Sequence, residues 1–247
     1  MASTPHDGPE PREFLNVDLA GARFLRTNLA GAVMRGVNAD GLSVDDPWLY
    51  EGGSLVVNGV DVALFVDSEL NRRFPGRSLR RASNPEGLRE AWTSLESTWA
   101  ATVERAQRMP AGTVDASVGG EWTFAQTLRH LVMATDVWLR RAALQLDEPL
   151  HPIGQPHAEY AEDGNDLAVF SFTDPSFDDV LAVRAERQAM VRGFLAQVTP
   201  AQLQEERQNP WWPVQVTVLS CVQTILEEEW EHHRYAVRDL DAIESAT

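Results

Sequence analysis

From Asn84 to the C-terminus, apolar residues recur at intervals of three and four positions, the period of an amphipathic α-helix. Asn84-Pro85-Glu86 is typical of a helix start, because asparagine caps free N–H groups and proline fits the first turn. The apolar stripes run through four stretches, residues 84–109, 121–139, 174–195 and 218–240. Residues 147–174 are rich in proline, glycine and histidine. The sequence therefore predicts a mainly α-helical protein, in which four helices form a bundle with one long crossover.

A different period, of five residues, governs the segment before these helices. From Val17 the chain divides into quintets whose third position reads Leu19, Phe24, Leu29, Met34 and Ala39. A period of five fits neither a helix nor a strand, but it fits a square-sectioned β-helix in which every fifth side chain points to the axis. Residues 13–41 therefore resemble pentapeptide-repeat proteins. The alternative is an irregular leader rich in alanine and glycine.

A short β appendage is expected to follow the quintets. Residues 49–65 alternate loosely between apolar and polar, and Asn58-Gly59 is a hairpin turn signal. We therefore expect residues 1–80 to form a pentapeptide-repeat-like β segment and residues 84–247 to form the helical domain. Little more than one coil of quintets cannot bury its own core, so the segment should lean on the rest of the protein.

Charge and cysteine content restrict the partners. The formal net charge of −16 argues against nucleic acid and anionic membranes, because phosphate groups repel such a surface. The first residues lack a basic region followed by an apolar stretch, so we expect no secretory signal. One cysteine, Cys221, excludes an internal disulfide and fits a reducing cytoplasm. We expect a cytoplasmic protein with a small-molecule substrate, and a homodimer is one option for its assembly.

Carboxylates and imidazoles are concentrated in residues 227–235 of the last predicted helix. Residues four apart lie on one helix face, so Glu228 and His232 can bind one ion together. Glu229 and His233 have the same spacing. Either pair could instead be an exposed ion pair on an acidic helix, and such pairs commonly bind nothing.

A third ligand is available on the second predicted helix. His130 lies eight residues after Trp122 in that stretch. Combined with either pair, it would give a His/His/carboxylate site with open positions, as catalytic metals need. A lone histidine is also readily explained as a structural residue.

The Trp-x7-His segment, the Glu-x-Trp-x-His segment, their order and the four-helix layout resemble the DinB/YfiT-like superfamily, over residues 86–245. Within it, the sequence looks most like the mycothiol-dependent branch that includes maleylpyruvate isomerase. The resemblance implies a DinB-type four-helix bundle and maps the family's metal ligands onto His130, Glu228 and His232. Many members have histidine where Glu228 stands, and glutamate there is the pattern of the mycothiol-linked branch.

The helical wheel of the last stretch is in conflict with that mapping. Its apolar stripe centres nearer Glu229 and His233, and an unpaired buried carboxylate would be unfavourable, which favours these two as the metal pair. His130, however, also lies off the apolar stripe of its own helix. A site at the edge of the bundle, facing a cleft, suits Glu228 and His232, which we prefer.

Three functions are compatible with these residues. The first is a metal-dependent thiol S-transferase or isomerase acting on a small electrophile, with a low-molecular-weight thiol such as mycothiol as cosubstrate. The second is hydrolysis by a metal-bound water. The third is a non-enzymatic protein, with a structural metal or with an acidic coil that mimics DNA. Zinc is the expected metal, and nickel and manganese accept the same ligands.

Two further features lie near the expected site. Cys221 is two turns before Glu228 and could line the cleft, although we favour a buried thiol that packs as a small hydrophobe. The segment from His151 to His157 lies in the crossover. It could form a lid over the metal, supply another ligand, or be a connector stiffened by proline and glycine.

Overall fold

The computed structural model describes residues 13–49, 52–147 and 149–246, and the chain divides into two compact units. The first unit is Met1–Asp45 and the second is Asp46–Thr247. The division lies well before the expected boundary at residues 80–84. Residues 46–83 belong to the same unit as the helices.

The backbone of the first unit repeats every five residues. Positive φ angles occur at Asn16, Gly21, Arg26, Gly31, Gly36 and Gly41. Every tenth residue a turn closes with a hydrogen bond of 2.9–3.1 Å, from Ala22 to Leu19, from Ala32 to Leu29 and from Leu42 to Ala39. The predicted period is therefore present in the backbone. Residues 13–45 of this unit are all exposed, so these residues form no packed core of their own.

The second unit begins with a small hairpin. Strands β1 (Val56–Val57) and β2 (Val60–Asp61) pair antiparallel. The turn residues Asn58 and Gly59 have φ angles of 49° and 85°, which is the left-handed geometry of a type I′ turn, so this hairpin prediction is confirmed. Helix α1 (Ala63–Arg73) and the 3-10 helix η1 (Arg77–Arg81) follow. The β segment that we expected to continue to about residue 80 therefore ends at Asp61.

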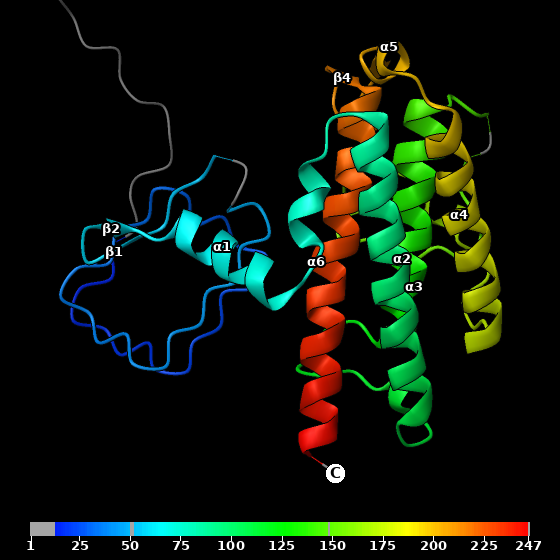
Figure 1. The fold of residues 1–247 in the computed structure, drawn as a ribbon. Coiled ribbons are helices and arrows are strands. Elements are labelled where there is room, and N and C mark those ends of the chain that lie inside the picture. Colours follow the sequence, from blue (N-terminus) through cyan, green and yellow to red (C-terminus); the bar gives the residue numbers. More distant parts are fainter. Residues whose placement is uncertain (1–12, 50–51, 148, 247) are drawn as a thin grey trace, which may run out of the picture. The chain divides into compact units, whose positions relative to one another are not determined.

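Four long helical segments contain most of the helical residues of the second unit, and Figure 1 shows them side by side. They are α2 (Pro85–Arg108), α3 (Phe124–Thr135) with its π-helical continuation η3 (Asp136–Ala143), α4 (Phe177–Gln197) and α6 (Val218–Ser245). The prediction of a mainly helical protein is confirmed. In the part of the chain that the structure describes, no helix has the length and apolar character to cross a membrane.

Polar side chains fix where these helices begin. Asn84 accepts a hydrogen bond from the backbone N–H of Gly87 at 2.9 Å, as its position before the first stripe predicts. Thr123 and Gln126 form a capping box at the start of α3. That box places His130 two turns into the helix.

The helices enclose one hydrophobic core. Its largest fully buried apolar side chains are Trp92, Trp99, Trp230, Leu88, Leu95, Leu128, Leu131, Leu139, Ile153 and Leu195. Each side chain of this size stabilises the fold by roughly 1.5–3 kcal/mol through burial. Cys221 is 0% exposed within the same core, so the prediction of a buried thiol that packs as a hydrophobe is confirmed.

Short elements connect the long ones. They are η2 (Thr113–Asp115), η4 (Leu167–Val169), α5 (Pro200–Leu203) and the antiparallel pair β3 (Glu206–Gln208) and β4 (Gln215–Thr217). The crossover between η3 and α4 has a small core of its own, with Tyr160 and Phe170 packed against Met133 and Val137.

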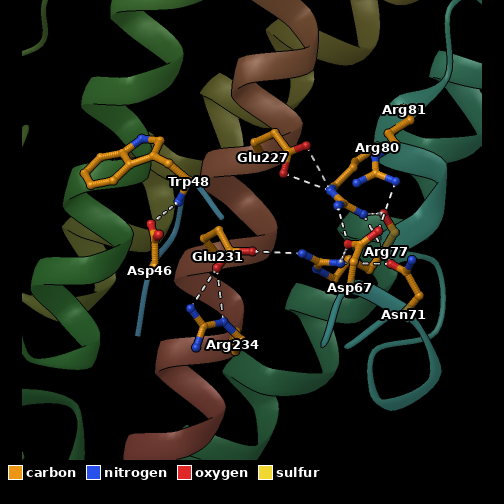
Figure 2. Close-up of polar contacts among 10 residues, drawn as sticks. All are labelled: Asp46, Trp48, Asp67, Asn71, Arg77, Arg80, Arg81, Glu227, Glu231 and Arg234. Atoms are coloured by element: carbon orange, nitrogen blue, oxygen red, sulfur yellow. Dashed lines mark hydrogen bonds and ion pairs between the residues drawn. The ribbon is translucent and has the colours of Figure 1, made fainter. Parts of the chain in front are cut away.

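Buried ion pairs attach α1 and η1 to α6, as Figure 2 shows. The guanidinium groups of Arg77 and Arg80 are fully buried, and each contacts Asp67 of α1, at 2.7 and 2.8 Å. Arg77 also contacts Glu231 at 3.2 Å, and Arg80 contacts Glu227 at 2.8 Å. Buried charges need such partners, so these contacts make α1 and η1 an integral part of the helical unit.

Candidate metal centre

Three side chains from two helices converge at one place in the second unit. His130 comes from α3, and Glu228 and His232 come from α6. One ligand atom of each lies within 4.8 Å of the others. Glu228 Oε2 is 3.4 Å from His130 Nε2 and 3.3 Å from His232 Nε2. These are the three residues that the family resemblance selected, and that they bind a metal stays a prediction.

The spacing of these atoms suits a metal ion. Ligand atoms about 2.1 Å from a tetrahedral ion are roughly 3.4 Å from one another. The two distances that Glu228 makes match that spacing. Two imidazoles and a carboxylate are ligands that zinc and other first-row divalent ions accept.

An indole ring lies against both imidazoles. The Trp122 ring centroid is 4.7 Å from that of His130 and 5.8 Å from that of His232, with an interplanar angle of 20° to the second. Trp122 directly precedes Thr123, the N-cap of α3, and is therefore held at a fixed place beside the helix start. The sequence pattern involves Trp122 only through its spacing from His130 and does not predict its contact with the two rings.

A backbone carbonyl fixes the orientation of His130. Its Nδ1 atom lies 2.9 Å from the carbonyl oxygen of Gln155 in the crossover. A carbonyl only accepts hydrogen bonds, so Nδ1 carries the proton and donates it. In the neutral ring the lone pair of Nε2 then faces Glu228. No sequence signal identifies Gln155, because the group that acts is its backbone.

The local environment shifts the pKa values of Glu228 and His232. Burial raises the pKa of Glu228, but the imidazoles of His130 and His232 beside its carboxylate outweigh this effect and hold that pKa well below its usual range. Burial lowers the pKa of His232. Both shifts favour an anionic carboxylate and a neutral imidazole, the forms that bind metals.

The second pair on α6, Glu229 and His233, faces the core. Glu229 is 1% exposed and pairs with the guanidinium of Arg184 from α4. His233 is buried, with Nε2 2.9 Å from Thr102 Oγ1 and its ring edge-on to Trp99. Burial lowers the pKa of His233 to about 4. The helical wheel thus located the buried face correctly, and Arg184 supplies the charge that makes a buried carboxylate tolerable there.

The acidic residues around Glu228 are paired with arginines. Glu227 contacts Arg80 at 2.8 Å, and Glu231 contacts Arg77 at 3.2 Å. Glu228 differs from these two and from Glu229, since its ion-pair contacts are the two imidazoles. Among the carboxylates of residues 227–231, Glu228 is thus the one directed at the histidine cluster.

The histidines of the crossover lie outside this cluster. His151 Nδ1 accepts a hydrogen bond from the backbone N–H of Ile153 at 3.1 Å. His157 lies 3.2 Å from Asp163 and edge-on to Trp211. Neither joins the candidate metal group. The crossover reaches the site through Gln155 instead.

A family model described as the DinB superfamily matches residues 94–236, more than half of the chain. The matched region includes all three residues of the cluster. No curated protein and no solved structure matches the chain.

Proposed function

The chain belongs to the DinB superfamily, and on that premise we propose that it binds one divalent metal ion through His130, Glu228 and His232. One observation carries the proposal. Because His130 Nδ1 donates to a carbonyl, its Nε2 lone pair faces a carboxylate oxygen 3.4 Å away. Neither atom has a proton to share when the imidazole is neutral, so a cation between them would satisfy both acceptors. The ligand spacing supports a metal ion in that role, with zinc first and nickel or manganese as alternatives.

We further propose that the four long helical segments form a DinB-type four-helix bundle. Residues 13–41 would then form a pentapeptide-repeat-like coil. The five-residue recurrence of positive φ supports the second assignment.

The activity that we propose is that of a thiol S-transferase or isomerase, with a low-molecular-weight thiol such as mycothiol as cosubstrate. Three protein ligands leave at least one coordination position for a substrate atom. A divalent ion in such a site lowers the pKa of a bound thiol and so supplies a thiolate at neutral pH. Glutamate at position 228 is the pattern of the mycothiol-linked branch, which supports this choice.

The surrounding carboxylates favour thiol chemistry over hydrolysis. A hydrolase that activates water usually has a general base within hydrogen-bond reach of it. Glu227, Glu229 and Glu231 are each held by an arginine, so Glu228 is the carboxylate among these four that faces the cluster. The thiol itself would instead be the nucleophile, and Trp122 against both imidazoles would restrict the water that reaches it.

Elemental analysis of the purified protein is the first test, and it should find about one divalent ion per chain. Cobalt-substituted protein should then develop a sulfur-to-metal charge-transfer band in the near ultraviolet when mycothiol is added. The His232→Ala variant should not. A Cys221→Ser background shows that the band comes from the added thiol. Protein without metal would refute the site, whereas turnover of an ester or amide with no response to thiols would assign a metal hydrolase.

A further inference from the structure

We infer that Arg129 is a positioning residue, which holds residues 153–155 of the crossover against α3 and thereby sets the orientation of His130. The inference rests on the proposed metal site for one of its two readouts. Arg129 is not one of the three proposed metal ligands.

The Arg129 side chain binds the crossover at three backbone carbonyls. Its Nε donates to the Ile153 oxygen at 2.8 Å, its Nη2 to Phe172 at 3.3 Å and its Nη1 to Thr173 at 3.4 Å. These oxygens come from two stretches about 20 residues apart, so one guanidinium ties both ends of the crossover to α3. The rigid fork of donors in arginine can span them, whereas a lysine ammonium is a single point.

The same stretch of crossover contacts the two adjacent residues of α3. The backbone N–H of Gln155 donates to the carbonyl oxygen of Arg129 at 3.2 Å. The Gln155 carbonyl accepts the Nδ1 proton of His130 at 2.9 Å. Arg129 therefore holds the residue whose carbonyl selects the tautomer of His130.

A second anchor lies at the start of this stretch. The backbone N–H of His151 donates to Asp136 Oδ2 at 2.8 Å, and Asp136 is buried beside Arg187 at 2.6 Å. Ile153 is 0% exposed in the main core. Residues 151–155 are thus held at several points, and Arg129 is the contact nearest to His130.

Loss of the Arg129 contacts should weaken metal binding through His130. Without a fixed carbonyl at Nδ1, His130 can place its proton on Nε2, and that tautomer has no lone pair facing the site. Loss of a group that orients a ligand typically weakens metal binding roughly 10- to 100-fold.

The first experiment measures zinc affinity of the full-length protein by competition with a chromophoric chelator. Arg129→Gln should bind zinc roughly 10- to 100-fold more weakly than wild type. Electrostatics alone predicts the opposite sign, because removing a positive charge beside a cation site strengthens cation binding. Arg129→Lys keeps the charge and should also bind more weakly. Unchanged or tighter binding in both variants would overturn the inference.

Arg140→Gln is the matched control. Arg140 lies on η3, the continuation of the same helix, and donates to the carbonyl of Pro149 at 2.5 Å, so its loss also breaks a contact with the crossover. That contact with the crossover is at Pro149, outside residues 153–155. Equal loss of zinc affinity in the two glutamine variants would overturn the specific role of Arg129.

The second experiment needs no metal. Nitrogen NMR of the imidazoles in metal-free protein should show His130 protonated at Nδ1 in the wild type. In Arg129→Gln the Nε2-protonated tautomer should appear as well, while His157 keeps the pattern that it has in the wild type. A wild type that binds no zinc would refute the metal site and leave this test intact. An unchanged tautomer in a folded Arg129→Gln variant would refute the role of Arg129.

Discussion

Arg80 of η1 contacts the carboxylate of Glu227 at 2.8 Å, on the residue that directly precedes Glu228 in α6. The residue on the other side of Glu228 is paired in the same way, because Glu229 contacts Arg184. Two elements that are distant in sequence, η1 and α4, therefore pair with acidic residues of one helix. The arginines occupy the carboxylates on either side of Glu228, which leaves Glu228 facing imidazoles.

Removing either histidine of the cluster should abolish metal binding without unfolding the protein. His130→Ala and His232→Ala each delete one of the three proposed ligands from a cluster that is only partly buried, so the helices should be retained. We expect metal content to fall from about one ion per chain to near zero, with unchanged helical circular dichroism. His157→Ala, from the crossover, is the control and should keep its metal. Full occupancy in either ligand variant would show that the cluster is not the site.

The buried pair of Glu229 and Arg184 should contribute to stability and not to metal binding. Glu229→Gln leaves the guanidinium of Arg184 in the core without its counter-charge, and breaking a buried pair in this way typically destabilises a protein by roughly 3–5 kcal/mol. Urea unfolding should show that loss, whereas the variant keeps about one metal ion per chain below the transition.

A double variant separates charge from packing. Glu229→Leu combined with Arg184→Met removes both charges, so it should recover much of the stability that the single change loses. Loss of metal in folded Glu229→Gln would instead favour Glu229 and His233 as the chelating pair.

The sequence was sufficient to predict elements whose cause is local. The apolar stripes, the Asn84 cap and the Asn58-Gly59 turn depend on neighbouring residues, and each is present in the structure. Convergence of His130, Glu228 and His232 was predicted from spacing and resemblance together, since spacing alone left Glu229 and His233 as an equal alternative.

Contacts between distant segments could not be predicted in the same way. On a helical wheel Glu229 lies on the buried face as an unpaired charge, because nothing in the sequence marks Arg184 as its partner. The Gln155 carbonyl is a backbone group and has no residue type to reveal it. Helix α1 was missed because its buried face includes the charged residue Asp67 while the large apolar Leu64 and Phe65 are exposed, so its pattern is not that of an amphipathic helix.

The attachment of α1 and η1 should be a major source of stability. Arg80→Met leaves Asp67 and Glu227 without one of their cationic partners, in an environment where Asp67 is buried. We expect a loss of about 3 kcal/mol in the free energy of unfolding, measured in urea. Arg72→Ala removes an exposed ion pair with Glu69 within α1 and should leave the urea midpoint of unfolding essentially unchanged. Equal midpoints for the two variants would mean that the buried pairs do not hold this element.

Cys221 should make the protein less stable between about pH 9 and pH 11. Burial raises the pKa of its thiol from 9.0 to about 11. Across that window the unfolded chain releases the proton and the folded chain retains it, so the free energy of unfolding falls as the pH rises, by up to roughly 3 kcal/mol. The sequence contains no lysine, which removes the usual titration in this range. Burial also raises the pKa of Tyr160, so the measurement is the difference in pH slope between wild type and Cys221→Ala.

At neutral pH the burial of Cys221 predicts slow reaction of the native thiol with a disulfide reagent and fast reaction in urea. A parallel pH dependence in the two proteins, or rapid labelling of native protein, would contradict a buried, protonated Cys221.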